Sequence, residues 1–189
     1  MNKQRVYITS GVSGSGKSTY IKNHNLDSVS SDEIVENYAK ENGFNYTEAF
    51  DEIQSKKLFG AINSIFFDNI VHNIKSGKDF VIDRTSLNSY TRKSLVELIR
   101  TNGDVEIVVV YFDIPRETII KRLKDREAKT GKGIPEDVID KQFENFTKPT
   151  IDEGYDTLEI ISWKLVLDAI ILWSQYHTKH GGSMIRTEK

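Results

Sequence analysis

Residues 11–18, Gly-Val-Ser-Gly-Ser-Gly-Lys-Ser, match the phosphate-binding loop pattern G-x-x-x-x-G-K-[ST] in full. In this pattern the backbone N–H groups of a glycine-rich turn surround a β-phosphate, and the lysine adds a mobile positive charge. The preceding residues 5–10 are strand-like, and residues 19–24 suit a helix whose positive dipole end would face the phosphates. A plain tight turn does not require the Lys-Ser pair, so the sequence predicts binding of a nucleoside triphosphate.

This loop supplies most of the candidate binding residues. Lys17 is expected to reach the β- and γ-phosphate oxygens, and the Ser18 hydroxyl is the expected Mg²⁺ ligand. The predicted nucleotide-binding residues are Gly11, Ser13, Gly14, Ser15, Gly16, Lys17, Ser18 and Thr19.

Carboxylates follow three of the predicted strands. Asp32 lies at the end of the second strand, where ligands of parallel α/β sheets bind, and it suits the carboxylate that takes the acceptor proton in phosphoryl transfer. The same stretch also suits a helix start capped by Ser31 or Asp32, and the two roles do not exclude each other. Asp83 could hold a metal-bound water or contact the acceptor, and the alternative is that it only forms a turn. Asp113 is expected to cap the helix that begins at Pro115.

The segment Lys121–Lys132 holds six basic and two acidic side chains. Arg122 and Arg126 are four residues apart and therefore share one face of a helix. Residues 128–133 then suit a loop with glycine hinges. One interpretation is a lid whose arginines stabilise charge on a transferring phosphoryl group. The alternative is an ordinary solvated helix face.

These residues need a framework that brings them together. Strand-like runs at 4–9, 28–32, 79–83, 105–112 and 157–161 alternate with helical patterns, which indicates a parallel sheet covered by helices. A long helical region ends at Ser76-Gly77, and another helix is expected from Ser89 to Thr101. The predicted fold class is therefore α/β, a P-loop NTPase fold with a parallel sheet of about five strands, flanking helices and a helical or loop lid.

Composition restricts the possible partners and location. The chain has 189 residues and no cysteine, so disulfides and thiolate metal sites are excluded. Its net charge is −2, so the overall charge does not favour binding of nucleic acid. The apolar stretch Trp163–Trp173 contains two charges and is too short to span a bilayer. Because the first strand begins close to the first residue, we expect no signal peptide, no membrane partner and a cytoplasmic location.

Together these residues resemble the polynucleotide 5′-hydroxyl kinase family of P-loop phosphotransferases, which includes the phage polynucleotide kinase. The resemblance is to the kinase module of this family only. The resemblance covers roughly residues 4–161 and rests on Gly11–Thr19, Ser30–Asp32, Asp83–Ser86, Phe112–Pro115 with Arg122–Arg126, and Ile134–Val138. It implies transfer of the ATP γ-phosphate to a hydroxyl, with Mg²⁺ and a lid over the nucleotide. By position, Asp32 resembles the general base and Asp83 an essential acceptor-side carboxylate. Arg122 and Arg126 resemble the lid arginines that grip the donor phosphates, and Lys17 is the catalytic lysine.

On this resemblance we expect one P-loop kinase domain over residues 1–178. Its lid would span about 121–134, an extra C-terminal helix about 162–178, and residues 179–189 would form a tail. The extra helix has apolar residues on more than one face, so it would cover the sheet edge or mediate self-association.

One departure from the family concerns the acceptor. Polynucleotide kinases usually carry an arginine three residues after the base, where it engages a phosphate of the acceptor strand, but this position is Val35 here. The leading hypothesis is phosphorylation of a 5′-hydroxyl end of DNA or RNA. The alternatives are a kinase of a nucleoside, nucleotide, modified base or other small molecule, and a nucleotide-regulated binding protein.

Overall fold

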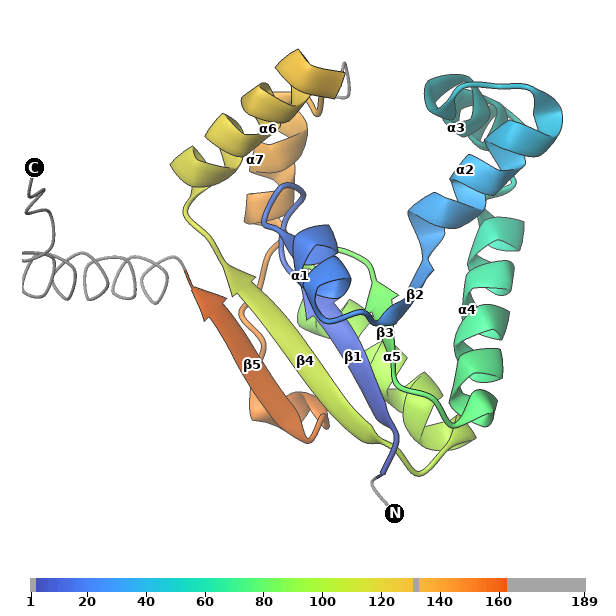
Figure 1. The fold of residues 1–189 in the computed structure, drawn as a ribbon, viewed down its shortest axis with the longest axis vertical. Helices are drawn as coiled ribbons and strands as arrows, with labels where there is room; N and C mark the ends of the chain where they lie inside the picture. The colour runs from blue at the N-terminus through green and yellow to red at the C-terminus, as the bar shows by residue number, and fades with distance from the viewer. Residues whose placement is uncertain (1–2, 131–132, 163–189) are drawn as a thin grey trace, which may run out of the picture.

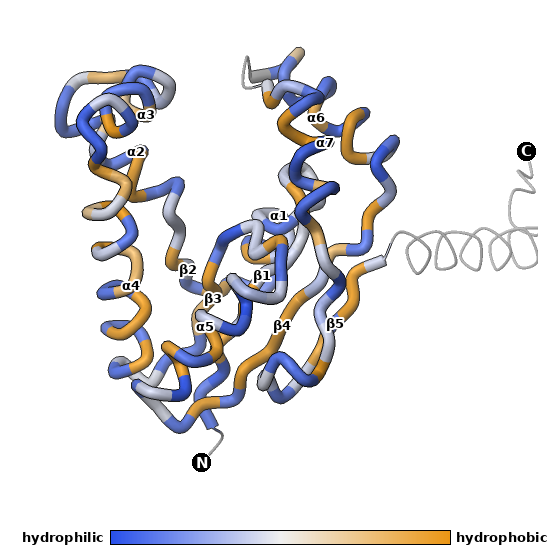
Figure 2. The backbone as a smooth tube through the Cα atoms, turned by 180° about the vertical axis from the view of Figure 1, so that it is seen from behind, coloured by the Kyte–Doolittle hydropathy of each residue, from blue (hydrophilic) through white to orange (hydrophobic). Residues whose placement is uncertain are grey.

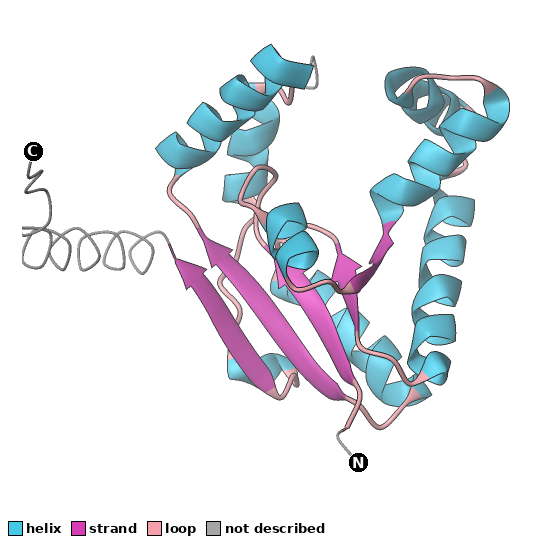
Figure 3. Cartoon of the chain, in the orientation of Figure 1, coloured by secondary structure: helices cyan, strands magenta, loops and turns pink. Residues whose placement is uncertain are grey.

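The computed structural model describes residues 3–130 and 133–162. Its centre is a five-stranded, all-parallel sheet with the strand order β2-β3-β1-β4-β5 (Figures 1 and 3). The strands are β1 Arg5–Ser10, β2 Asp27–Ser30, β3 Phe80–Asp83, β4 Glu106–Asp113 and β5 Thr157–Ser162. The predicted α/β fold class is confirmed, and each predicted strand is present within about two residues of its expected bounds.

Helices cover both faces of this sheet. They are α1 Lys17–Asn23, α2 Ser31–Asn42, α3 Tyr46–Ser55, α4 Phe59–Ser76, α5 Ser89–Asn102, α6 Arg116–Thr130 and α7 Glu136–Glu144, with a short 3₁₀ helix at Ile151–Glu153. Along β1, Val6 and Ile8 are fully buried in one core with α4 and α5, whereas Tyr7 packs into a second core with α1, α6 and α7. The orange, apolar stretch of β4 in Figure 2 lies between these two cores, as expected for a strand that is buried on both faces.

The helical region between β2 and β3 consists of three helices. Gly43 ends α2 in the left-handed conformation, and Asn45 begins α3 with a capping box to Glu48. Helices α2, α3 and α4 share a small core of their own around Ala49 and Ile53. In Figure 1, α2 and α3 rise on one side of α1, and α6 and α7 rise on the other. The strand ends with their chemistry-bearing residues lie between these two groups of helices.

Parts of the predicted lid and C-terminal region lie outside the described residues. Helix α6 continues through Thr130, so the prediction of a loop from Ala128 is wrong for residues 128–130. Residues 131–132 of the predicted lid are not among the described residues. The predicted C-terminal helix (162–178) lies outside them except for Ser162, which ends β5, and the predicted tail (179–189) lies outside them entirely. In the described part of the chain, none of the helices has the length and hydrophobicity needed to cross a membrane.

Candidate active site

The phosphate-binding loop connects β1 to α1 and needs glycine for its shape. Gly14 has a φ of +80°, and a Cβ there would lie 3.0 Å from two side-chain carbons of Leu123 in α6. Gly16 has a φ of +108° and directly precedes the first residue of α1. Both are left-handed conformations that side chains rarely adopt, so the glycine spacing of the motif has a direct backbone cause. The loop is also fixed from outside, since the Gly11 N–H donates to the Thr85 carbonyl at 2.8 Å.

The loop and the start of α1 fit an oligophosphate. The first i→i−4 bond of α1 runs from the Tyr20 N–H to the Gly16 carbonyl at 3.0 Å, so the amides of residues 17–19 have no partner within the helix. The Ser15 hydroxyl is buried, and it has no hydrogen-bond partner among the residues that the structure describes. These donors face a pocket of about 710 Å³ that is lined by residues 14–20 together with Arg122 and Arg126. The pocket therefore combines amide donors, one lysine and two arginines.

Helix α6 brings its two arginines to this pocket. The Arg122 guanidinium donates to the Ser15 carbonyl at 3.1 Å, and Arg126 lies one turn further along the same helix. The structure therefore places both predicted lid arginines beside the phosphate-binding loop. Both side chains are exposed, and this position is compatible with contacts to donor phosphates.

Lys17 lies between the loop and the two candidate carboxylates. Its Nζ donates to the carbonyls of Gly11 (3.0 Å) and Val12 (2.9 Å). Burial lowers the pKa of Lys17 to about 8, and the negative charges of Asp83 and Asp32 oppose this shift. Both carboxylates are therefore close enough to attract the ammonium group. The structure thus brings Lys17, which is predicted to contact the donor phosphates, together with the two carboxylates predicted for the acceptor side.

Strand pairing explains why Asp32 and Asp83 meet. Ser30, the last residue of β2, pairs in register with Asp83, the last residue of β3. Asp32 comes two residues after Ser30, so both carboxylates lie at the carboxyl ends of neighbouring strands. Burial raises the pKa of Asp83, the Asp32 charge adds to this effect, and Lys17 opposes it. The prediction of Ser31 or Asp32 as a helix cap is wrong, because Ser30 caps α2 by accepting from the Asp32 N–H at 3.2 Å. The Asp32 carboxylate is exposed in the first turn of α2, where it can meet a substrate.

The capping role predicted for Asp113 is also wrong. Its carboxylate accepts a hydrogen bond from the Tyr111 hydroxyl at 2.8 Å. Within the described residues it makes no hydrogen bond to the first turn of α6. The Val35 side chain, at the position where the resembling family carries an arginine, is buried in the small core of α2 and α3 and does not face solvent.

Three further contacts were not visible to sequence reasoning. Gln142 of α7 holds Ser13 of the phosphate-binding loop, accepting from its N–H at 2.8 Å and donating to its hydroxyl at 3.1 Å. Tyr46 of α3 lies beside Asp32. Burial is the first cause that raises its pKa to about 12, and Asp32 adds to the shift by its charge and by a hydrogen bond. No local pattern marks these residues, because their partners lie far away along the chain.

The third contact is a fully buried ion pair behind the loop that follows β3. The Arg92 guanidinium donates to both carboxylate oxygens of Glu153, at 2.7 and 2.6 Å. It also donates to the carbonyls of Ser86 (3.0 Å) and Leu87 (3.2 Å). The pair therefore fixes the backbone that follows Asp83, and through Thr85 it supports the phosphate-binding loop.

The described part of the chain contains no group of three or more His, Cys, Asp and Glu side chains arranged to hold a metal ion. Ser18, the predicted Mg²⁺ ligand, lies exposed in the first turn of α1 and lines the pocket beside Lys17. Its hydroxyl and the oxygens of a bound triphosphate are the donors that Mg²⁺ takes in such sites.

Comparison with solved structures finds similar folds among kinases and in an RNA repair complex. A candidate kinase from Chloroflexus aurantiacus has 15% identity and a TM-score of 0.64, over 96% of this chain and 99% of that chain. A chain of the Pnkp1/Rnl/Hen1 RNA repair complex has 22% identity and a TM-score of 0.57, over 77% of this chain and 44% of that chain. A gluconokinase from Sinorhizobium meliloti 1021 has 17% identity and a TM-score of 0.51, over 95% of this chain and 100% of that chain.

At these identities the likeness shows the fold alone, which is that of P-loop kinases. A comparison with curated proteins found no match. The family comparison is more specific, because residues 6–149 match the AAA domain family, and this range contains the phosphate-binding loop, both carboxylates and both arginines. The chain therefore belongs to the AAA domain family.

Proposed function

We propose that this protein is an ATP-dependent kinase that transfers the γ-phosphate to a hydroxyl, in the first place a 5′-hydroxyl end of DNA or RNA. The observation that carries the proposal is the position of Lys17. Its ammonium group donates hydrogen bonds to the phosphate-binding loop and is attracted by the carboxylates of Asp83 and Asp32. The ammonium group of Lys17 therefore interacts both with the loop proposed to bind the ATP phosphates and with the carboxylates proposed to bind the acceptor. The P-loop kinase-like fold and the two arginines beside the loop support this function.

In the proposed reaction, Asp32 accepts the proton of the acceptor hydroxyl as its oxygen attacks the γ-phosphorus of ATP. A new P–O bond forms, the bond between the γ-phosphorus and the β,γ-bridging oxygen breaks, and ADP leaves. Lys17, Arg122 and Arg126 neutralise charge on the transferring group and on ADP. Mg²⁺, held by Ser18 and the phosphates, would add further neutralisation. Helix α6 acts as the lid of a domain that spans residues 1–178.

Two acceptor classes are compatible with this chemistry. The exposed position of Asp32 supports an acceptor that extends into solvent, as a nucleic-acid end does, and the likeness to a chain of an RNA repair complex agrees with it. A small hydroxyl-bearing molecule is the second candidate, because the Val35 side chain is buried and cannot contact an acceptor phosphate, and because a gluconokinase shares the fold.

The acceptor assay decides between these classes. The full chain is incubated with Mg²⁺ and ATP labelled at the γ-phosphate, together with 5′-hydroxyl DNA and RNA oligonucleotides or with nucleosides, nucleotides and gluconate. We expect label at oligonucleotide 5′ ends and no label on oligonucleotides that already carry a 5′-phosphate. Label on a small molecule alone would move the assignment to the second candidate. Hydrolysis without any labelled acceptor would contradict the kinase and favour a nucleotide-regulated binding protein.

Binding of ATP should weaken as the pH rises above about 8. The pKa of Lys17 is lowered by burial to about 8, and bound phosphates favour the protonated form, so the pKa rises in the complex. Each pH unit between the two pKa values then costs about tenfold in affinity, so we expect about tenfold weaker binding at pH 9 than at pH 7. Titration calorimetry with MgATP at both pH values measures this change. Lys17→Ala should bind weakly with little pH dependence, and an equal slope in this variant would contradict the assignment to Lys17.

A further inference from the structure

The loop after β3 carries a cation, Arg84, that is held in place by neutral groups. Its guanidinium carbon lies 4.5 Å from the ring centroid of Phe66, and its Nη2 donates to the Asn63 side-chain carbonyl at 3.2 Å. Both contacts come from α4. Among the described residues, no carboxylate forms an ion pair with this guanidinium. A stacked ring and an amide therefore orient the charge without neutralising it.

The backbone of Arg84 is fixed on the opposite side. The Thr9 hydroxyl of β1 donates to the Arg84 carbonyl at 2.8 Å, and the next carbonyl, that of Thr85, accepts from the phosphate-binding loop. The buried pair of Arg92 and Glu153 holds the residues that follow. Arg84 is therefore preorganised relative to the phosphate-binding loop, and little conformational entropy remains to be lost when it binds a ligand.

Arg84 faces the acceptor side of the site. It follows Asp83, which pairs in register with Ser30, so it leaves the sheet beside the start of α2. Burial lowers the pKa of Arg84, and the negative charge of Asp32 opposes this shift, so the guanidinium and the carboxylate of Asp32 attract each other. An arginine presents five N–H donors in a planar fork that matches an oxyanion. Among residues 3–130 and 133–162, the guanidinium donates one hydrogen bond, to Asn63, which leaves further N–H donors for a ligand next to Asp32.

We propose that Arg84 binds a phosphate of the acceptor, adjacent to the hydroxyl that Asp32 activates. The proposal rests on the kinase function above and narrows its substrate class to acceptors with an anionic group close to the hydroxyl. In a nucleic-acid end this group is the first internucleotide phosphodiester. The stacked, half-buried guanidinium forms charge-assisted hydrogen bonds with it, which are about twice as strong as neutral ones. Arg84 thus selects the acceptor and sets its hydroxyl against Asp32.

The test compares two 5′-hydroxyl oligonucleotides that differ only in the first linkage, a charged phosphodiester or a neutral methylphosphonate. We expect Arg84→Gln to raise the KM for the phosphodiester oligonucleotide about 10- to 100-fold, because one or two charge-assisted bonds are lost. The KM for the methylphosphonate oligonucleotide and the KM for ATP should change less than about threefold. Arg84→Lys should lie between wild type and Arg84→Gln, since it retains the charge and loses the fork.

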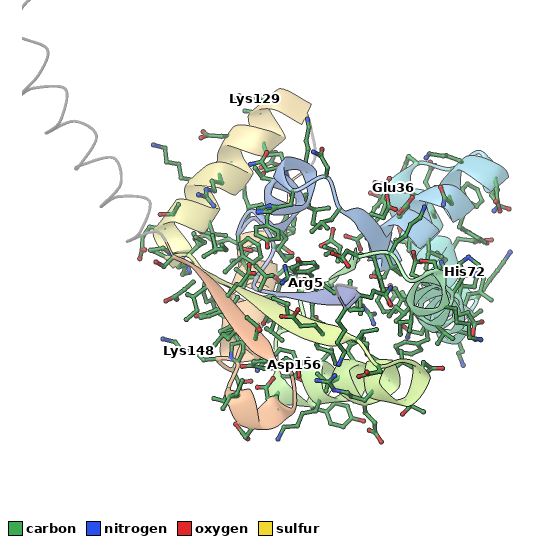
Figure 4. All side chains as sticks on the ribbon, turned by 60° about the horizontal axis from the view of Figure 1, so that its bottom comes forward. Arg5, Glu36, His72, Lys129, Lys148 and Asp156 are labelled. Carbon is green, nitrogen blue, oxygen red and sulfur yellow. The ribbon has the colours of Figure 1, made fainter. Side chains whose placement is uncertain are left out.

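The matched control is Arg5→Gln, the same chemical change at the amino end of β1. Arg5, labelled in Figure 4, forms an ion pair with Glu106 at 2.9 Å. This variant should leave both KM values unchanged. Equal losses by Arg84→Gln on the two oligonucleotides would mean that Arg84 only supports α4, and would overturn the proposal. Unchanged KM values of Arg84→Gln for both oligonucleotides would also overturn the proposal.

A second measurement separates this proposal from the kinase assignment. If the wild-type protein phosphorylates no acceptor, the proposed function fails, and equilibrium binding by fluorescence anisotropy still tests Arg84. Tighter binding of the phosphodiester than of the methylphosphonate oligonucleotide, abolished by Arg84→Gln, would support an anion site at Arg84. Equal binding of the two by the wild-type protein would overturn it.

Discussion

Asp32→Asn should lower kcat for phosphoryl transfer by about 100- to 10,000-fold, which is the usual contribution of a positioned general base. The amide is isosteric with the carboxylate but cannot accept the proton of the acceptor hydroxyl. The capping of α2 is retained, because Ser30 accepts from the backbone N–H of residue 32 and not from its side chain. We therefore expect a nearly unchanged KM for ATP and an unchanged melting temperature. Initial rates at saturating ATP, with thermal unfolding as a check, measure the effect.

Glu33→Gln is the matched control for this variant. Glu33 is an exposed acidic residue beside Asp32 in the same first turn of α2, so both changes remove one negative charge at the same helix terminus. Any general effect on the helix dipole or on the surface potential appears in both variants. Full phosphoryl-transfer activity of Asp32→Asn would show that another group takes the proton, and it would contradict the role of Asp32 as general base. A large loss in Glu33→Gln would point to the field of the helix terminus.

Glu153→Gln should lower the free energy of unfolding by about 3–5 kcal/mol, the range found when one partner of a buried ion pair is removed. Glu153 accepts from two guanidinium nitrogens of Arg92, and both side chains are almost completely buried. The substitution leaves the Arg92 charge in the interior without its counter-ion. Because Arg92 also binds the carbonyls of Ser86 and Leu87, the loop after Asp83 should loosen as well. Urea unfolding followed by circular dichroism measures the loss.

Asp152→Asn provides the comparison, since it removes the neighbouring carboxylate at the surface. Asp152 is 72% exposed and lies 3.7 Å from Lys93, so water screens its ion pair and we expect a much smaller loss of stability than for Glu153→Gln. A similar small change for both variants would show that water reaches Arg92 and that the pair contributes little. If Glu153→Gln is stable but loses activity, the pair acts mainly on the geometry of the loop.

The sheet could be predicted because its strands carry continuous apolar runs. In β4, residues 107–112 are all buried, so the sequence needs no polar alternation and signals a central parallel strand. The helical region between β2 and β3 was harder, because Gly43 and Asn45 interrupt a pattern that otherwise continues at helical spacing. The loop expected from Ala128 failed for a similar reason. The glycines at positions 131 and 133 suggested that the helix ends before Ala128, but α6 continues to Thr130.

The roles of single carboxylates were less predictable than the elements that carry them. Ser30, Ser31 and Asp32 are all good N-cap residues, and only backbone geometry decides which of them caps α2. Asp113 suited a helix cap by position, yet the Tyr111 hydroxyl binds its carboxylate. Such choices depend on differences of about 1 kcal/mol among neighbouring polar groups, which composition does not resolve.

The phosphate-binding loop was determined by the sequence alone, because its glycines, lysine and serine are contiguous and its shape depends on local φ angles. The relation of Lys17 to Asp32, Asp83 and Arg84 was decided only by the tertiary structure. Lys17 follows β1, Asp32 follows β2, and Asp83 and Arg84 lie at the end of β3. The strand order β2-β3-β1 brings these three segments to one edge of the sheet. Strand order results from the packing of both faces of the sheet over the whole chain, and Arg92 reaches Glu153 across 61 residues for the same reason. Local patterns carry no information about such pairings.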